Sequence, residues 1–205
     1  MLHLETVEPA TLALLKDIQG LPELSETRLV GGTALALQVG HRVSVDLDVF
    51  GHWPNDCDLR PILSRCGKTV YQSGGGKLQF YKVNGVKVDC VTYDYPWIDR
   101  PVIEDGLRLA SEKDIAALKI NAITNRGTRK DFVDFAFLLR RHSLKEMFDW
   151  FRQKYQDTNP ILAVRSLVYF VDAEEQPLPR MLVPFDWEAA KDEIRAAVRS
   201  LFGGM

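Results

Sequence analysis

The sequence lacks the features of a disulfide-stabilised, zinc-binding or membrane-spanning protein. Its 205 residues contain only three cysteines, an odd number without zinc-type pairing: Cys57, Cys66 and Cys90. No apolar run reaches the roughly 18 residues of a membrane span, and acidic residues interrupt the apolar N-terminal stretch, so no secretory signal is predicted. The four histidines show no ligand spacing. We therefore expect reduced thiols, a cytoplasmic location and no membrane partner.

The chain also lacks a strong charge of either sign. It has 26 Lys and Arg residues against 28 Asp and Glu, which gives a formal net charge of −2 and excludes a general polyanion binder. Basic residues nevertheless outnumber acidic ones from Lys119 to Lys145: Lys119, Arg126, Arg129, Lys130, Arg140, Arg141 and Lys145 against Asp131 and Asp134. This segment either faces phosphate groups or is an ordinary solvated surface.

A strand-like run over residues 44–50 carries two carboxylates two positions apart. Side chains alternate along a strand, so Asp46 and Asp48 are expected to point the same way. Neighbouring like charges repel unless a cation lies between them, and Mg²⁺ accepts one or two carboxylate ligands. The alternative is the exposed face of an ordinary strand.

Upstream, residues 29–37 predict the end of a buried strand, a glycine pair and an apolar helix. Gly31 and Gly32 allow positive φ and close approach of a ligand, and Thr33 lies where the first helical N–H groups meet anions. The phosphate loop of nucleoside triphosphatases is excluded because no Gly-Lys-Ser/Thr follows. Gly-Gly-Thr alone also fits a structural turn. Combined with the aspartate pair, it predicts a phosphate–metal site.

A third carboxylate lies in the middle of an alternating strand. Asp89 follows the hairpin signal Asn84-Gly85, and aspartate is disfavoured inside strands, so it needs either a solvated face or a partner. If neighbouring strands bring it beside Asp46 and Asp48, the three carboxylates can hold two Mg²⁺ ions. Such a pair of ions serves in-line phosphoryl displacement.

The segment from Ser111 to Asp134 predicts two helices separated by a break near residues 125–128. Lys119 follows the buried stripe of the first helix, where it could reach a triphosphate or be an ordinary solvated lysine. Asp131 could accept a hydrogen bond from Lys119 or an arginine and hold it in place. Asp134 is expected to be structural.

These motifs resemble the nucleotidyltransferase superfamily with the polymerase-β-type fold: a Gly-Gly turn, a helix, Asp-x-Asp and a later lone aspartate. The wording GGTALALQVGHRVSVDLDVF is similar to the AbiEii/AbiGii family of abortive-infection toxins. The block from Lys119 through Arg126 to Lys130-Asp131 and Asp134 also resembles that family. The matches run from about residue 29 to residue 139.

The resemblance implies an α+β nucleotidyltransferase fold, with a small mixed β-sheet flanked by helices and a C-terminal helical region. We place a core lobe at residues 1–100 and a helical lobe at 101–205. The implied metal ligands for Mg²⁺ or Mn²⁺ are Asp46, Asp48 and Asp89, which with Lys119 and Asp131 form the implied catalytic set. The implied nucleotide-binding residues are Gly31, Gly32, Thr33, Arg42, Ser44, Lys119 and Arg126.

The implied function is a metal-dependent nucleotidyltransferase. It would move a nucleoside monophosphate from a nucleoside triphosphate (NTP) to a hydroxyl of RNA, including tRNA, or of a protein. A toxin of a type IV toxin–antitoxin system would also have a cognate antitoxin. Two alternatives are a non-catalytic nucleotide or RNA sensor with this fold, and a structural partner-binding domain.

Overall fold

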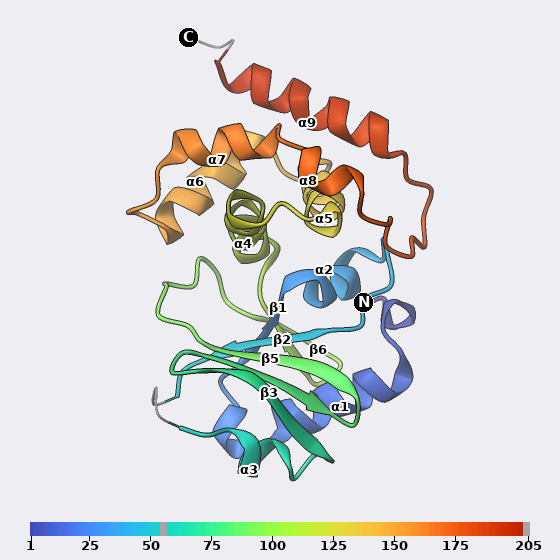
Figure 1. Cartoon of the computed structure of the whole chain (residues 1–205), viewed down its shortest axis with the longest axis vertical. Helices are drawn as coiled ribbons and strands as arrows, with labels where there is room; N and C mark the ends of the chain where they lie inside the picture. Colours follow the sequence, from blue (N-terminus) through green and yellow to red (C-terminus); the bar gives the residue numbers. More distant parts are fainter. Residues whose placement is uncertain (54–56, 203–205) are drawn as a thin grey trace. The chain divides into compact units, whose positions relative to one another are not determined.

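The structure, a computed structural model, describes residues 1–53 and 57–202 and divides into two compact units (Figure 1). Unit 1 comprises Met1–Tyr95 and Arg100–Ala110, and unit 2 comprises Pro96–Asp99 and Ser111–Met205. The chain therefore passes between the units three times. The boundary predicted at residue 100 lies where the chain returns to unit 1.

Unit 1 is built on one mixed sheet whose strand order is β3-β4-β5-β2-β1-β7-β6. Its strands are β1 (Arg28–Val30), β2 (Leu47–Gly51), β3 (Thr69–Gly75), β4 (Leu78–Val83), β5 (Val86–Thr92), β6 (Val102–Glu104) and β7 (Leu107–Leu109). The pairs β2/β5 and β1/β7 are parallel and the others antiparallel. The helical elements of unit 1 are η1 (Leu4–Thr6), α1 (Pro9–Gly20), η2 (Pro22–Leu24), α2 (Gly31–Val39) and α3 (Arg60–Leu63).

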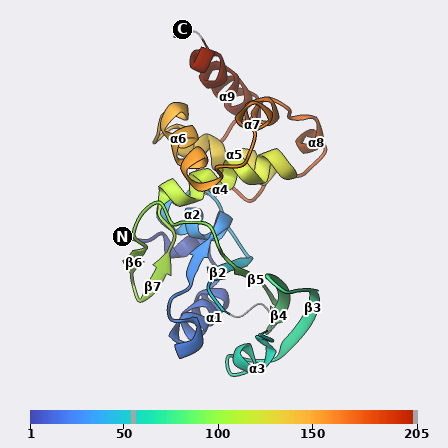
Figure 2. The same cartoon turned by 90° about the vertical axis from the view of Figure 1, so that its left-hand side faces the viewer.

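The central strands bury one face completely. Leu47 and Val49 on β2, with Val88 and Cys90 on β5, are inaccessible to solvent, as the period-2 pattern predicts. Leu59, immediately before α3, lies over this face, because its backbone N–H donates to the buried Gln79 side chain on β4. In Figures 1 and 2, α2 lies on the other side of the sheet from α1 and α3. The intervening residues of β2 and β5 therefore face the α2 side.

The hairpin turn before β5 has the backbone that its sequence predicts. Asn84 and Gly85 both have positive φ, 50° and 86°, as a type I′ turn requires. The short β6–β7 hairpin at the sheet edge (Figure 2) is absent from the sequence analysis, because two strands of three residues carry too little periodicity.

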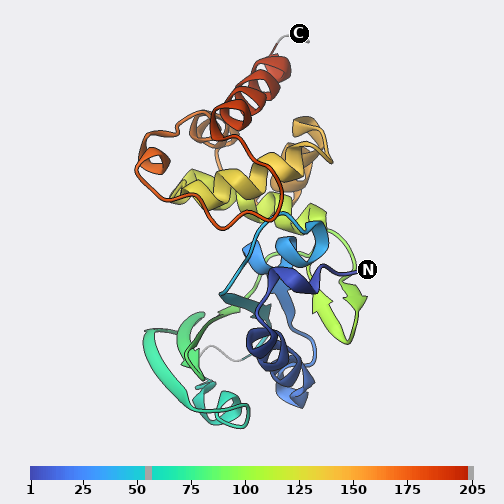
Figure 3. The ribbon, with the colours of Figure 1, turned by 90° about the vertical axis from the view of Figure 1, so that its right-hand side faces the viewer.

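Unit 2 consists of helices: α4 (Glu112–Asn125), α5 (Arg129–Leu139), α6 (Leu144–Lys154), α7 (Pro160–Leu167), α8 (Val171–Glu174) and α9 (Trp187–Phe202). Ser143 and Glu146 form the expected capping box at the start of α6. Figure 3 shows α9, in red, beside α5 and α7. The predicted α+β class is confirmed. Within residues 1–53 and 57–202, no helix has the length and apolar character needed to cross a bilayer.

A fully buried ion pair fastens the Pro96–Asp99 segment inside unit 2. Lys154 Nζ on α6 lies 2.7 Å from Asp114 Oδ1 on α4 and donates to the Pro96 carbonyl at 2.7 Å. Asp114 also accepts from the Ile98 N–H at 2.9 Å and from the Ser111 hydroxyl at 2.7 Å. Both charged side chains are 0% exposed, so these contacts replace their lost hydration.

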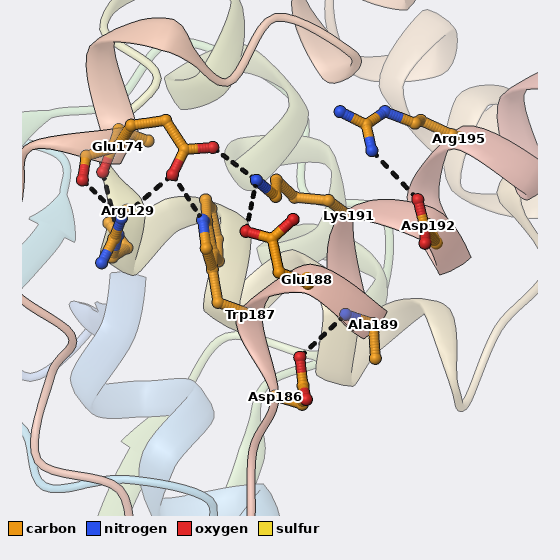
Figure 4. A network of polar contacts seen from close by, with 10 residues as sticks. Arg129, Glu174, Asp186, Trp187, Glu188, Ala189, Lys191, Asp192 and Arg195 are labelled. Atoms are coloured by element: carbon orange, nitrogen blue, oxygen red, sulfur yellow. Dashed lines mark hydrogen bonds and ion pairs between the residues drawn. The ribbon is translucent and has the colours of Figure 1, made fainter.

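A second polar network joins α5, α8 and α9 (Figure 4). The Arg129 guanidinium lies 4.8 Å from the Trp187 ring centroid and donates to the backbone carbonyls of Ala173 and Glu174. The Glu174 carboxylate accepts from Trp187 Nε1 at 2.9 Å and from Lys191 Nζ at 2.5 Å. Arg129 is therefore occupied in holding the helices of unit 2 together.

Candidate active site

The sheet of unit 1 brings two of the predicted carboxylates together. Asp48 on β2 and Asp89 on β5 are direct register partners on adjacent parallel strands, so their side chains leave the same face. Each strand buries the residues on either side of its aspartate, which leaves the carboxylates on the half-exposed α2 face. Residues 41 positions apart thus share one site.

Asp46 is not positioned by the alternation of strand side chains that the sequence predicts. The predicted strand over residues 44–50 begins only at Leu47, and Val45 is 56% exposed. Asp46 lies in the preceding loop, where its backbone carbonyl accepts a hydrogen bond from the Thr33 hydroxyl. That hydrogen bond ties the loop to α2.

Gly31 begins α2 where the chain passes closest to the carboxylates. Its φ is +68°, and a Cβ placed on it would lie 2.3 Å from Asp48 Oδ2, so only glycine fits. The antiparallel pairing of Val30 with Asp48 creates this approach. Gly31 and Gly32 are half-exposed in the first turn of α2, and within residues 1–53 and 57–202 no side chain caps the start of that helix. The first-turn N–H groups therefore lie beside Asp48.

Four predicted nucleotide-binding side chains are buried instead of facing solvent, three in unit 1 and Lys119 in unit 2. Thr33 is 1% exposed, and its hydroxyl lies 2.8 Å from the Ser44 hydroxyl, itself on a 7% exposed residue. Arg42 is 4% exposed and donates to the Val43 carbonyl at 2.9 Å. In this structure, Thr33 and Ser44 anchor the loop that carries Asp46.

Lys87, which is not among the predicted site residues, contacts one of the three carboxylates. Its Nζ donates to Asp89 Oδ2 at 2.6 Å. Burial lowers the pKa of Lys87, but the hydrogen bond to Asp89 and the negative charges of Asp89, Asp46 and Asp48 outweigh burial and raise it. All three carboxylates therefore act on one ammonium. The Lys-Val-Asp alternation, which places Lys87 and Asp89 on one strand face, was the signal available in the sequence.

The carboxylates offer metal ligands, but they do not form a ready-made metal centre. Among the described residues, no group of three or more His, Cys, Asp or Glu side chains is positioned to hold a metal ion. Asp89 Oδ1 is buried and accepts no hydrogen bond from the residues that the structure describes, so a hard oxygen ligand is available beside Asp48. The pair of Asp48 and Asp89 fits a divalent cation in its donor type and placement.

Unit 2 contains the second group of predicted residues. Lys119 Nζ lies 3.0 Å from Asp131 Oδ1 and 2.6 Å from Asp134 Oδ2, and both aspartates are fully buried. Arg126, whose side chain is 59% exposed, donates to both oxygens of Asp131 at 2.9 and 3.1 Å. The Thr128 hydroxyl donates to Asp131 at 2.6 Å. Asp131 therefore holds Lys119 and Arg126 together.

Electrostatics keep Asp131 ionised. Burial raises its pKa, but the positive charges of Lys119 and Arg126 and the hydrogen bonds from Arg126 and Thr128 outweigh burial and lower it below the ordinary value. The other basic side chains of this segment are largely neutralised: Arg129 pairs with Glu174, Arg140 with Glu193, Arg141 with Glu112 and Lys145 with Asp149. The basic excess in the sequence is thus mostly cancelled.

Solved structures with the same fold are nucleotidyltransferases or related proteins. JHP933 from Helicobacter pylori aligns with a TM-score of 0.60 at 20% identity, covering 97% of this chain and 90% of that one. MenT4, the nucleotidyltransferase toxin Rv2826c from Mycobacterium tuberculosis H37Rv, aligns with a TM-score of 0.54 at 16% identity, covering 93% and 84%. At these identities the similarity shows the fold, and it confirms the predicted nucleotidyltransferase fold.

Sequence comparison shows the family. An uncharacterized protein of Aquifex aeolicus (strain VF5) is 33% identical over 194 residues, covering 90% of this chain and 92% of its relative. The family model described as "Nucleotidyl transferase AbiEii toxin, Type IV TA system" matches residues 13–203. The chain belongs to the AbiEii family of nucleotidyltransferase toxins.

Proposed function

We propose that this protein is a metal-dependent nucleotidyltransferase that moves a nucleoside monophosphate from an NTP to a hydroxyl of RNA, with tRNA as one candidate acceptor. The observation that carries the proposal is the register of β2 and β5. It sets Asp48 beside Asp89, while Gly31 starts α2 against the Asp48 carboxylate. Carboxylates beside a helix N-terminus suit a metal-bound triphosphate, because one group attracts the cation and the other the phosphate.

Asp48 and Asp89 would hold the Mg²⁺ or Mn²⁺, with Asp46 as a further ligand from the loop. When bound, a divalent ion neutralises phosphate charge and orients the attacking and leaving oxygens. The buried Asp89 Oδ1 without a hydrogen-bond partner supports this assignment. The carboxylates would keep the acceptor hydroxyl in line with the α-phosphate.

The first turn of α2 would bind phosphate oxygens through the backbone N–H groups of Gly31 and Gly32. Thr33 would act differently from its sequence-based expectation, because its hydroxyl already donates to the Asp46 carbonyl. Its contribution would be to position Asp46. In unit 2, the exposed Arg126 is a proposed phosphate-binding side chain that Asp131 orients. Lys119 is buried against Asp131 and Asp134, so its proposed role is to hold Asp131 in place. Arg42 is buried and donates to the Val43 carbonyl, so its proposed role is to stabilise the loop that leads to Asp46.

We further propose that the protein is the toxin of a type IV toxin–antitoxin pair. Membership of the AbiEii family supports this proposal, as does the fold shared with MenT4, a nucleotidyltransferase toxin. The antitoxin would be the cognate partner.

The decisive experiment is a transfer screen with each α-³²P-labelled NTP, Mg²⁺ or Mn²⁺, and total RNA, purified tRNA or total protein as acceptor. We expect label on RNA with the wild type and none with Asp46→Ala/Asp48→Ala. Asp17→Asn is the matched control, because Asp17 is an exposed carboxylate on α1 outside the site. Its transfer should equal that of the wild type.

The acceptor arms separate the alternatives. Label on protein alone would mean that the acceptor is a protein hydroxyl and not RNA. Metal-dependent NTP binding without transfer to any acceptor would support the sensor. Wild-type protein that binds no NTP with either metal would overturn the enzyme and the sensor together.

A further inference from the structure

Lys87 occupies the position where the acidic residues meet. It leaves β5 on the same face as Asp89 and contacts that carboxylate at 2.6 Å. Its ammonium also experiences the negative charges of Asp46 and Asp48. A lysine ammonium here supplies the positive charge that the clustered carboxylates require.

The contact with Lys87 involves only one of the two carboxylate oxygens of Asp89. Oδ2 accepts from Lys87, whereas Oδ1 is buried without a hydrogen-bond partner. An unsatisfied buried carboxylate oxygen is costly, so it indicates a ligand that arrives later. The absence of a three-residue metal cluster among the described residues agrees with Asp89 being engaged elsewhere.

Lys87 can leave more easily than its partner. The Lys87 side chain is 49% exposed and ends a flexible four-carbon stem, while the Asp89 side chain is only 13% exposed. Releasing the ammonium into water therefore costs little, whereas Asp89 stays in the sheet and needs a replacement cation.

We propose that Lys87 is the resident counter-cation of these carboxylates, and that a divalent metal binds by displacing its ammonium from Asp89. This inference rests on the proposed function, because it assumes that Asp46, Asp48 and Asp89 are metal ligands. Lys87 would thus hold the acidic residues together until the metal arrives, at the expense of metal affinity.

The test measures Mn²⁺ binding without nucleotide, using the electron paramagnetic resonance signal of free Mn²⁺ to obtain the dissociation constant. Lys87→Gln should bind Mn²⁺ about fivefold more tightly than the wild type, the gain expected from losing one partly exposed ion-pair competitor. Lys87→Arg, which keeps the charge, should bind like the wild type. Far-UV circular dichroism checks the fold of each variant.

Lys82→Gln is the matched control for charge alone. Lys82 is exposed and directly opposite Lys87 on β4, but Lys87 alone of the two donates a hydrogen bond to Asp89 among the described residues. Its removal should change the Mn²⁺ dissociation constant by less than about twofold, because exposed charges beyond contact distance are screened.

Three results would overturn the exchange. Equal Mn²⁺ affinity in Lys87→Gln and the wild type would overturn it while leaving the proposed function intact. A gain that persists fully in the Asp89→Asn background would show through-space repulsion instead of displacement. No Mn²⁺ binding in any variant would overturn the proposed metal site itself, and the exchange with it.

Discussion

Replacing Lys154 with methionine should destabilise unit 2 severely. The substitution keeps the length of the side chain but removes the ammonium that faces Asp114, and both partners are 0% exposed. The Asp114 carboxylate would then remain buried with hydrogen bonds from Ile98 and Ser111 but without its cation. Removing one partner of a buried ion pair costs about 3–5 kcal/mol. Because the hydrogen bonds from Ile98 and Ser111 remain, we expect a loss at the low end of this range, about 3 kcal/mol.

A nearby exposed pair provides the comparison. Lys113 Nζ lies 2.8 Å from Asp99 Oδ2, and each side chain is 45% exposed. Water solvates both charges after the pair is broken, so Lys113→Met should cost about 0–1 kcal/mol. The two variants remove the same functional group and differ in burial.

Urea unfolding followed by circular dichroism at 222 nm measures both losses, because the helices of unit 2 dominate that signal. With a denaturant slope of about 2 kcal/mol/M, a loss of about 3 kcal/mol lowers the Lys154→Met midpoint by about 1.5 M. Lys113→Met should move it by less than about 0.5 M. Adding Asp114→Asn to Lys154→Met should recover part of the loss, because the amide carries no unpaired charge.

The reasoning would be refuted by equal midpoints for Lys154→Met and Lys113→Met. It would also be refuted if the double variant were less stable than Lys154→Met by the full cost of a second independent loss. Either result would mean that burial does not determine how much the Lys154–Asp114 ion pair contributes to the free energy of unfolding.

The remaining predictions concern three other sites. Thr33→Val should cost about 1–3 kcal/mol in urea unfolding, because it leaves the Asp46 carbonyl and the Ser44 hydroxyl without their partner; Thr33→Ser should retain most of the stability, and equal losses would contradict the role of the hydroxyl. The pKa of Asp131 is lowered in the folded state, so the ionised carboxylate contributes stability that is fully present above the ordinary carboxyl pKa of about 4 and is lost as the pH falls below that value. Asp131→Asn should therefore flatten the dependence of the unfolding free energy on acid pH, and an unchanged dependence would contradict this role of Asp131. Burial and the charge of Asp89 raise the pKa of the Cys90 thiol to about 12. Iodoacetamide should therefore alkylate the half-buried Cys66 in the native protein but Cys90 only in denaturant, as detected by mass spectrometry. Alkylation of Cys90 in the native protein would show that solvent reaches the buried face of the sheet.

Much of the fold is predictable from local patterns. Period-2 alternation over Val86–Thr92, positive φ at Asn84-Gly85 and the capping box at Ser143 each depend on neighbouring residues, and the structure contains all three. The β6–β7 hairpin and the short helix α8 could not be predicted in this way, because elements of three or four residues span too few repeats of the strand or helix period to show a pattern.

The sequence by itself indicated the family and the candidate site residues: the Gly-Gly turn, the Asp-x-Asp pair, the lone Asp89 and the Lys119–Asp131 block. Only the tertiary structure decided what each side chain touches. It set Asp48 beside Asp89, withdrew Thr33 and Ser44 into a buried hydroxyl pair, engaged Arg129 with Trp187 and brought Lys87 onto Asp89. The physical reason is that these contacts depend on strand register and burial, which arise from packing between segments distant in the chain.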